Sequence, residues 1–433
     1  MPRLPGTGLV PRIYDSATQS LRSALPHGTA SIYVCGITPY DTTHLGHAAT
    51  YLAYDTLIRV WLDAGYPVNY VQNTTDVDDP LLERAARDGV DWRELAADQT
   101  QLFRDDMERL QIIPPDRYVA VTEIVTEVAE AVQELLDRGI AYPVDSPDAA
   151  PDLYFDSAAA ERASAESLDG STPWHLGAEC NLDRATMLEL SAERGGDPQR
   201  PGKRDALDPV LWRSVRPGEP AWDTVLGRGR PGWHIECAVI AARYLPTPIT
   251  VNGGGSDLLF PHHEFSAGHV AVLTGHALAD VYSHAGLVAY RGEKMSKSLG
   301  NLVLVSRLVA EGVDPRAIRL ALLSEHYRGD WEWTDAHLTT AQTRLAAWDA
   351  WASDPGDSGS HGLPSGQAEP DDTAGDGTAA VDELRRLLAD DLNSPAALDA
   401  VDARIASGDA CTVSLVTAIH ALLGIRLRAL PTD

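Results

Sequence analysis

The sequence predicts an α/β protein built on a Rossmann-like, doubly wound parallel sheet, with an inserted subdomain and a C-terminal helical domain. Three observations lead to this fold class. Residues 31–72 show a strand, helix, strand pattern, residues 233–290 show a second series of helices and strands, and residues 315–423 show mainly helical patterns. A parallel pair joined by a crossover helix is the unit of such sheets, whose ligands bind beyond the carboxyl ends of the strands.

The composition indicates a globular protein of two or three domains, because 433 residues can bury a substantial core. We find no run of eighteen apolar residues and no secretory leader pattern, so we expect a cytoplasmic protein without a membrane partner. Lys and Arg number 35 against 63 Asp and Glu, a formal charge of −28. An acidic surface disfavours a nucleic-acid partner, although local basic patches can still bind one. The alternative is that the acidity serves solubility or adaptation to salt.

The first strand, helix, strand unit begins at residue 31, and its first strand ends at Cys35. A Gly/Thr/Pro/Asp turn then leads to His44 and His47, beside a helix whose single apolar face spans residues 49–61. Free N–H groups at such a helix start favour a phosphate, and two imidazoles can donate to phosphoryl oxygens. The alternative for both histidines is a surface or capping role.

The second strand is expected at residues 66–72, and the polar turn at residues 73–80 follows at its carboxyl end, facing the same crevice. Residues 140–232 are mixed and rich in turns, which indicates an insertion between the two halves of the sheet. It contains a helix at residues 181–191 and then the segment ERGGDP at residues 193–198, whose glycines demand a tight loop. Helices of the first half are expected at residues 80–88, 92–110 and 122–139.

In the second half, a helix follows PGW, and a strand at residues 249–252 leads to a glycine-rich segment, residues 253–257, that we expect to form a backbone nest. A helix starts within residues 260–266, and a strand at residues 281–290 ends in a loop, residues 291–301. This loop presents lysines that could close on a polyphosphate or simply be solvated. The last helices are expected at residues 315–325, 334–351, 381–389, 394–405 and 412–423, with a low-complexity linker at residues 354–378.

Four cysteines, Cys35, Cys180, Cys237 and Cys411, are too widely spaced for a disulfide framework. Cys35, Cys237 and His262 all map to the rim of one sheet. Two thiolates and an imidazole are typical zinc ligands, and three protein ligands leave a fourth position open for substrate. No Cys-x-x-Cys spacing supports this site, and the alternative is that Cys35 and Cys237 are ordinary buried thiols.

HLGH at residues 44–47 and KMSKS at residues 294–298 resemble, in this order, the two signatures of class I aminoacyl-tRNA synthetases. Within that class, the segments YVCGITPYDTTHLGHAATY, PGWHIEC and GGGSDLLFPHHE resemble cysteinyl-tRNA synthetase and its relative, the mycothiol ligase that joins cysteine to glucosaminyl-inositol. The likeness covers residues 30–350 closely and the tail loosely.

The resemblance implies that Cys35, Cys237 and His262 hold Zn²⁺, which binds the cysteine substrate as its thiolate. It also implies that ATP is used with Mg²⁺, that His44 and His47 hold the α-phosphoryl group, and that Lys294 and Lys297 stabilise the departing pyrophosphate. Further residues are implied to surround the cysteinyl adenylate: Cys35, Gly36, Ile37, Thr38, Thr50, Asn73, Thr74, Thr75, Trp233, Gly255, Ser256, Asp257 and Val288.

Two departures from the synthetase pattern, and the short acidic tail, favour the ligase. Ser266 stands where the synthetase has a fourth ligand, a glutamate, and ERGGDP resembles the ligase, which makes it a candidate acceptor-sugar loop or, alternatively, a helix stop. The predicted reaction forms an amide from L-cysteine, ATP and glucosaminyl-inositol, without tRNA, in a monomer. The alternatives are a cysteinyl-tRNA synthetase and a non-enzymatic adenylate-binding protein, which the intact motifs oppose. Asp257 and Glu193 are guesses for the base that deprotonates the acceptor amine.

The predicted domain organisation has six parts. They are the first half of the catalytic domain (1–139), the inserted connective subdomain (140–230), the second half with the zinc site and KMSKS loop (231–301), a helical stem-contact-like region (302–353), a flexible linker (354–378) and a short C-terminal helical region (379–433).

Overall fold

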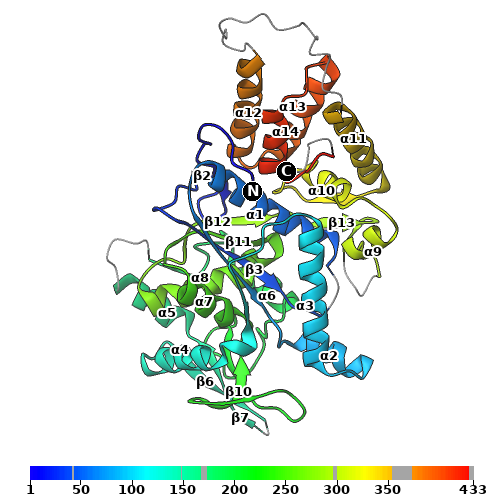
Figure 1. Ribbon diagram of the computed structural model, residues 1–433. Coiled ribbons are helices and arrows are strands. Elements are labelled where there is room, and N and C mark those ends of the chain that lie inside the picture. The colour runs from blue at the N-terminus through cyan, green and yellow to red at the C-terminus, as the bar shows by residue number, and fades with distance from the viewer. Residues whose placement is uncertain (41–42, 148, 167–172, 296–299, 354–372, 429–433) are drawn as a thin grey trace, which may run out of the picture.

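The computed structural model describes all residues except 41–42, 148, 167–172, 296–299, 354–372 and 429–433. At its centre is a five-stranded sheet with the strand order β12-β11-β3-β4-β5, in which every neighbouring pair is parallel (Figure 1). The chain starts at the middle strand, builds the β4 and β5 side, and returns through β11 to the opposite side. β3 and β11 therefore border the switch point at which ligands bind in such sheets. The five strands are β3 (Ala30–Ile37), β4 (Val68–Thr74), β5 (Arg117–Ala120), β11 (Ile249–Gly255) and β12 (Ala279–Ala285).

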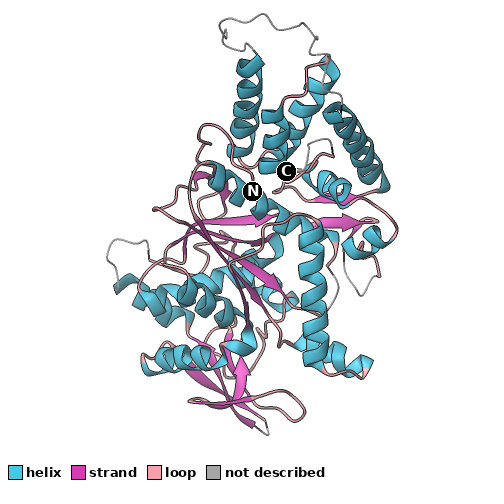
Figure 2. Ribbon diagram, in the orientation of Figure 1, coloured by secondary structure: helices cyan, strands magenta, loops and turns pink. Residues whose placement is uncertain are grey.

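Helices cover both faces of this sheet, so the predicted α/β doubly wound class is confirmed (Figure 2). Alternate residues of a strand point to opposite faces. Ile32 and Val34 of β3 pack with α1 (Leu45–Asp63), whereas Tyr33 and Cys35 pack with the second set of helices. That set comprises α4 (Val125–Asp137), α7 (Trp233–Tyr244) and α8 (Glu264–Thr274). Cys35 is thereby directed to the face covered by α7, the helix that carries Cys237.

The insertion folds around a second five-stranded sheet, in the order β6-β7-β8-β10-β9, whose neighbours are antiparallel. Its predicted helix is α6 (Arg184–Glu193), which starts three residues later than expected because Asp183 accepts a hydrogen bond from the Thr186 N–H and caps it. The other elements are β6 (Ala141–Ser146), β7 (Ala149–Phe155), α5 (Ser157–Glu166), β8 (Val210–Ser214), β9 (Trp222–Thr224) and β10 (Gly227–Pro231).

The remaining elements of the first half are a hairpin, one short helical turn and helices that pack around the central sheet; α3 packs on the α1 side through Phe103. β1 and β2 form an N-terminal hairpin. The predicted helices at 80–88, 92–110 and 122–139 are found as α2, α3 and the pair η1 and α4. Their bounds are β1 (Arg12–Asp15), β2 (Ser20–Ser23), α2 (Asp79–Asp88), α3 (Trp92–Arg109) and η1 (Val121–Glu123).

The single strand expected at residues 281–290 is wrong, because the structure divides it between two sheets. β12 ends at Ala285, and β13 (Val288–Tyr290) belongs to a three-stranded sheet in the order β14-β13-β15. The backbone at Gly286 passes close to the Gly329 carbonyl, leaving no room for a Cβ atom, and the Gly286 N–H donates to Tyr327 O at 2.7 Å. This close approach turns the chain out of the central sheet. The other two strands are β14 (Glu293–Lys294) and β15 (Trp331–Trp333).

The backbone nest expected at residues 253–257 is also wrong. β11 continues through Gly253 and Gly254 to Gly255, and none of these glycines has a positive φ. They are instead sites of close packing, since a Cβ on Gly253 would lie 2.5 Å from the Tyr54 ring and one on Gly254 would lie 2.8 Å from His263 Cε1. The short helices η2 (Ser256–Leu258) and η3 (Leu259–His263) then lead into α8.

The C-terminal part is helical, as predicted, but its expected linker is too long. α12 begins at Thr373, so residues 373–378 belong to a helix, and its buried side chains Ala380, Val381 and Leu384 mark where apolar periodicity first becomes visible in the sequence. The bounds are α9 (Val305–Ala310), α10 (Pro315–Leu323), α11 (Asp335–Ser353), α12 (Thr373–Ala389), α13 (Ser394–Ser407), α14 (Val413–Ala418) and η4 (Ile419–Leu423). No helix in the described part of the chain is long and apolar enough to cross a membrane.

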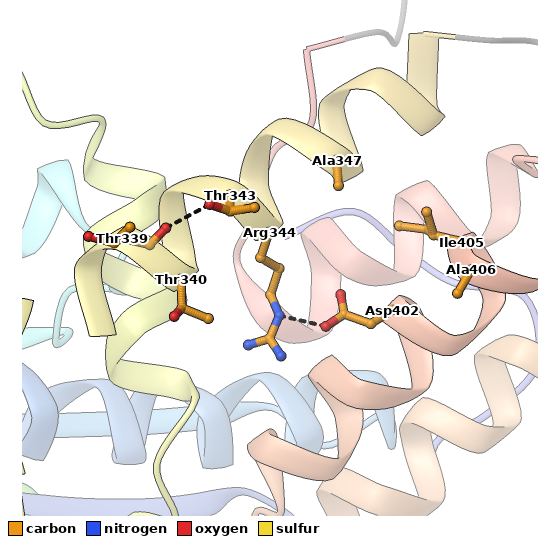
Figure 3. Close-up of a pocket in the computed structure, with 8 residues that line it drawn as sticks. All are labelled: Thr339, Thr340, Thr343, Arg344, Ala347, Asp402, Ile405 and Ala406. Carbon is orange, nitrogen blue, oxygen red and sulfur yellow. Dashed lines mark hydrogen bonds and ion pairs between the residues drawn. The ribbon is translucent and has the colours of Figure 1, made fainter. Parts of the chain in front are cut away.

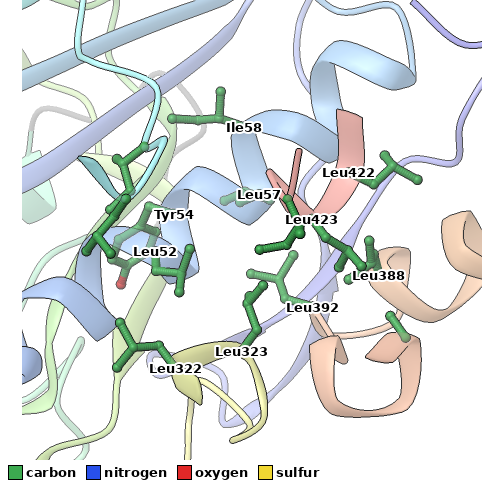
Figure 4. Packing of buried hydrophobic residues seen from close by; sticks show 14 of the residues in the cluster. Leu52, Tyr54, Leu57, Ile58, Leu322, Leu323, Leu388, Leu392, Leu422 and Leu423 are labelled. Carbon is green, nitrogen blue, oxygen red and sulfur yellow. The ribbon is translucent and has the colours of Figure 1, made fainter. Parts of the chain in front are cut away.

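One hydrophobic core joins the C-terminal helices to the catalytic sheet. Leu57 and Ile58 of α1 lie among leucines of α10, α12 and η4 in Figure 4. Within this core, Asp55 of α1 is paired with Arg59 and with Arg319 of α10. α1, which begins at the HLGH segment, is therefore fixed from behind by the tail of the chain.

Candidate active site

Cys35, Cys237 and His262 converge at the switch point of the central sheet. One ligand atom from each lies within 4.8 Å of the other two, and all three residues are buried. Cys35 comes from the end of β3, Cys237 from the second turn of α7, and His262 from η3. Among the described residues this is the only group of three or more His, Cys, Asp or Glu side chains with such spacing. The predicted ligand set is therefore brought together, and its two sulfurs and one nitrogen suit zinc.

The two thiols differ in their ease of ionisation. Burial, and the neighbouring Cys237, raise the pKa of Cys35, whereas a hydrogen bond from Cys35 lowers the pKa of Cys237 well below its usual value despite burial, with His262 contributing in the same direction. Of the two sulfurs, that of Cys237 is therefore the easier to ionise. A divalent cation would favour the second, because thiolates are its preferred soft ligands.

Two aromatic neighbours on α7 orient His262. His234 Nδ1 lies 3.0 Å from His262 Nδ1, and the Trp233 ring stacks beside the imidazole with centroids 4.3 Å apart. A partner on the second ring nitrogen is the usual way in which a ligating histidine is held in one tautomer. Trp233 was among the predicted site residues and His234 was not, although His234 precedes Cys237 by three residues, a spacing that places both on one side of a helix.

Ser266 does not complete the cluster. Its hydroxyl is buried and donates to the His234 carbonyl at 3.2 Å, so it serves α7 rather than a cation. The ligand group in the described part of the chain has three members.

The HLGH segment forms the start of α1. His44 Nδ1 accepts a hydrogen bond from the Gly46 N–H at 3.1 Å and caps the helix, and its ring stacks on His47 with centroids 3.9 Å apart. A Cβ on Gly46 would lie 2.9 Å from His44, so this cap requires glycine. The capping alternative for His44 is thus confirmed, and it leaves both half-buried rings at a helix N-terminus, where anions bind well. Thr50 Oγ1 donates to Gly46 O at 3.2 Å in the next turn.

The start of α1 lies beside residues 303–304. His44 forms an isolated antiparallel bridge with Leu304, and the Leu45 N–H donates to Val303 O at 2.9 Å. The chain that leaves the KMSKS loop therefore pairs with HLGH. The backbone of Lys294 lies in β14 opposite Ala289, whereas Lys297 lies outside the described residues.

Asn73 organises the turn after β4. Its Oδ1 accepts from the Gly36 N–H at 2.7 Å and from the Tyr33 hydroxyl at 3.0 Å, and its Nδ2 donates to Thr75 Oγ1 at 3.0 Å. The Thr75 N–H also donates to Ile37 O at 3.0 Å. Asn73 thereby ties the end of β3 to the end of β4, where Thr74 and Thr75 are buried.

The segment that follows β11, which was expected to contribute to the adenylate site, is held by the insertion. Arg194, from ERGGDP, donates through Nη1 to both Asp257 O and Phe260 O at 2.6 Å. Glu193 is exposed at the end of α6, and Gly195 has φ +85. The segment therefore ends the helix, as the alternative interpretation of ERGGDP as a helix stop predicted. Gly255, Ser256, Asp257 and Thr38 are half-buried at the sheet edge, and Val288 is buried at the start of β13.

Glu264, which sequence reasoning also missed, locks the insertion to α8. Its carboxylate accepts from Trp174 Nε1 and from the N–H groups of Gly177, Glu179 and Cys180, at 2.9–3.1 Å. A carboxylate in an HHE run resembles a metal ligand in sequence, but these four donors make it an anchor. No local signal separates the two roles, since its partners are about ninety residues away.

A separate pocket of about 440 Å³ lies between α11 and α13 (Figure 3). It is lined mainly by threonine and alanine side chains, and its Arg344 points toward Asp402, with Nε and Oδ2 2.8 Å apart. It offers no metal-ligand cluster or helix N-terminus.

The fold is that of class I aminoacyl-tRNA synthetases. The family described as "tRNA synthetases class I (C) catalytic domain" matches residues 22–343. Mycobacterium tuberculosis methionyl-tRNA synthetase in complex with methionyl-adenylate has a TM-score of 0.61 at 18% identity, covering 92% of this chain and 88% of its own. Agrobacterium radiobacter K84 agnB2 LeuRS, in its complex with tRNA and LeuAMS, has a TM-score of 0.63 at 13% identity, covering 93% and 84%.

Curated relatives with much higher identity show which family within this class the chain resembles. The L-cysteine:1D-myo-inositol 2-amino-2-deoxy-alpha-D-glucopyranoside ligase of Clavibacter michiganensis subsp. michiganensis is 61% identical, covering 99% of this chain and 97% of its own. The ligase of the same name from Nakamurella multipartita is 52% identical, covering 99% and 98%. The chain belongs to this family of cysteine ligases within class I.

Proposed function

We propose that the protein joins L-cysteine to the amine of 1D-myo-inositol 2-amino-2-deoxy-α-D-glucopyranoside in two steps, with ATP as the energy source. The single observation that carries this function is the buried Cys35, Cys237 and His262 cluster at the switch point. Tyr51 of α1, the helix that begins at HLGH, donates to Cys35 O at 3.1 Å. This arrangement supports a site that combines sulfur recognition with phosphate chemistry.

In the first step, the cysteine carboxylate attacks the α-phosphorus of ATP. A new P–O bond forms and the bond to pyrophosphate breaks, giving cysteinyl adenylate and pyrophosphate. His44 and His47, at the N-terminus of α1, hold the α-phosphoryl group. Lys294 and Lys297 neutralise the departing pyrophosphate, and Mg²⁺ bound to ATP would supply further positive charge. Cys35 to Thr38, Thr50, Asn73 to Thr75, Trp233, Gly255 to Asp257 and Val288 surround the adenylate, with Asn73 acting through the backbone it ties together.

In the second step, the amino group of the sugar attacks the adenylate carbonyl. The C–N bond of an amide forms, AMP leaves, and the amine loses one proton. ERGGDP is the candidate segment for contact with the amino sugar. Its support is the anchoring of Arg194 on Asp257 O and Phe260 O, which brings the segment to the edge of the crevice.

The cluster fits Zn²⁺ by the chemistry of its donors: two thiolates and an imidazole in a buried, three-ligand arrangement. When bound, the cation would act as a Lewis acid that accepts the soft sulfur of the cysteine substrate. A serine hydroxyl is a far poorer ligand for such a site, so discrimination against serine needs no editing. Trp233 and His234 keep His262 oriented for this role.

The test is AMP release from cysteine and ATP, with either the amino sugar or cysteine-accepting tRNA added, while labelled cysteine is followed into product. We expect stimulation and an amide with the amino sugar alone. Charging of tRNA alone would contradict the proposal and make this chain a shortened synthetase. No AMP release with either acceptor would contradict the ligation chemistry itself.

A further inference from the structure

Behind Cys35, three polar side chains form an unbroken line of contacts that the reaction just described does not use. His263 Nε2 lies 3.3 Å from Cys35 Sγ, His263 Nδ1 lies 2.7 Å from His284 Nε2, and His284 Nδ1 lies 2.7 Å from Ser16 Oγ. The three residues come from η3, from β12 and from the turn after β1. Each contact joins segments at least twenty residues apart, so the line is a product of the fold rather than of local sequence.

Packing holds this line in place. His263 has no exposed surface, and Gly254 leaves the space that its ring occupies, because a Cβ there would lie 2.8 Å from His263 Cε1. Ser16 is fixed by its backbone, since its N–H donates to Tyr282 O at 2.8 Å and its carbonyl accepts from Asn181 Nδ2 at 2.8 Å. The hydroxyl therefore meets His284 from a rigid position.

The chemistry of the four groups allows only one assignment of donors and acceptors along these contacts. A thiolate only accepts hydrogen bonds, so His263 must donate from Nε2 when Cys35 is a metal ligand. A neutral imidazole that donates from one nitrogen accepts at the other. His263 Nδ1 then accepts from His284 Nε2, and His284 Nδ1 accepts from the Ser16 hydroxyl. All four groups are satisfied in this single arrangement.

We propose that Ser16, His284 and His263 are positioning residues that direct one N–H donor at the Cys35 sulfur. This inference rests on the proposed metal site. A donor aimed at a ligating thiolate fixes the position of the sulfur, so that the metal site is held in the arrangement that the cation and the substrate sulfur require. Loss of the line should weaken both metal binding and the apparent affinity for cysteine.

The test uses the full chain, stripped of metal and titrated with Co²⁺ and Zn²⁺ against a chelator. His284→Leu removes the donor to His263, whereas His284→Gln keeps an amide N–H at the corresponding position. We expect His284→Leu to bind both ions 10–100-fold more weakly, the usual range for a partner of a metal ligand. Its sulfur-to-Co²⁺ charge-transfer band should also move, and its KM for cysteine should rise more than its kcat falls. His284→Gln should recover most of each loss.

Ser16→Ala and Ser16→Thr give a milder pair, because they change only the end of the line, and His27→Leu is a control at an exposed histidine. Ser16→Ala should shift the band and the affinity in the same direction but by less, and Ser16→Thr should not. If wild-type protein shows no cysteine-to-Co²⁺ band, the metal site and this inference both fail. If wild type shows the band, and His284→Leu and Ser16→Ala have the same band and the same metal affinity, the positioning role of Ser16, His284 and His263 is overturned while the metal site stands.

Discussion

At the scale of single residues, the site and its surroundings contain buried side chains whose pKa values differ from the ordinary ones. Cys237 lies between a second thiol and an imidazole, and its pKa falls because Cys35 donates to it, although burial opposes this. His269, one turn beyond Ser266 on α8, shows the opposite limit. It has no exposed surface, and burial lowers its pKa to about 3. The surroundings of Cys237 favour its charged form, whereas the core around His269 favours its neutral form.

Replacing Cys237 with serine should release the metal. The change removes one of two sulfurs from a three-ligand set, and a hydroxyl is a poor substitute for a thiolate. We expect the zinc content to fall from about one per chain to near zero and the KM for cysteine to rise by roughly 100-fold or more. Metal analysis and steady-state kinetics measure both. Cys411→Ser, in the C-terminal helices, is the matched control, and an unchanged zinc content in Cys237→Ser would remove this residue from the ligand set.

His269 should make stability depend on pH. In the unfolded chain its pKa is about 6.5, whereas in the folded protein it is about 3. Between these values the unfolded state binds the extra proton, so the free energy of unfolding falls as pH falls below 6.5. From pH 7.5 to 5.0 this one residue should account for a loss of about 2 kcal/mol.

Urea unfolding of wild type and His269→Leu at both pH values measures this effect. The variant should lose about 2 kcal/mol less than wild type over the interval, while His234, His263 and His284, whose pKa values are also lowered by burial, keep their effect in both proteins. His27→Leu serves as the exposed control. Equal losses in wild type and His269→Leu would contradict the prediction.

At the scale of elements, the sequence was informative where periodicity is local and silent where contacts are distant. The apolar face of α1, the strand that ends at Cys35 and the helix after PGW could all be predicted, because each depends on neighbouring residues. The turn at Gly286 could not, since the carbonyl that forces it belongs to Gly329. The three ligands followed from strand ends and a family likeness, whereas His263 to His284 and Arg194 to Asp257 are contacts between remote segments.

The ion cluster between α1 and α10 is the strongest example of such a distant contact. Asp55 is paired with Arg59 and Arg319, and the Ile113 N–H donates to it at 2.9 Å. Arg319 also donates to Leu423 O at 2.6 Å and Leu110 O at 2.7 Å. Burial raises the pKa of Asp55, but the two arginines more than offset it, so the net pKa lies below normal. The cluster is a joint between three elements rather than a surface ion pair.

Arg319→Met should therefore destabilise the protein by about 3 kcal/mol or more, the usual cost of breaking a buried ion pair. The variant strands two backbone carbonyls and leaves Asp55 with one cation. Arg307→Met, which breaks an exposed pair with Glu311, should cost less than about 1 kcal/mol. Chemical denaturation of both variants provides the comparison, and similar small losses in the two would show that the buried cluster contributes no more than a surface pair.

At the scale of the whole molecule, the C-terminal helices belong to the catalytic body. They cover α1 on the side away from the sheet, and the N-terminal strand β1 meets them through a parallel bridge between Arg12 and Asp390 (Figure 1). Arg59 of α1 donates to Ala421 O at 3.0 Å, and Arg385 of α12 pairs with Asp63 at the end of α1. The two ends of the chain thus hold the same helix.

A chain ending at residue 353 should consequently fail to fold stably, even though it retains every residue of the proposed site. It would lose four leucines, Leu388, Leu392, Leu422 and Leu423, each at most 2% exposed. Burial of one such side chain contributes about 1.5–3 kcal/mol. The four together are comparable with the roughly 5–15 kcal/mol that stabilises a typical domain. Truncation would also expose Leu57 and Ile58 of α1 and remove the hydrogen bonds from Arg59 to Ala421 O and from Arg319 to Leu423 O. We expect aggregation or a broad, early thermal transition by light scattering and calorimetry.

A chain ending at residue 428, which keeps all four leucines, should unfold as wild type does. A 353-residue chain with a wild-type transition and cysteine-dependent AMP formation would instead make the helices a separable module.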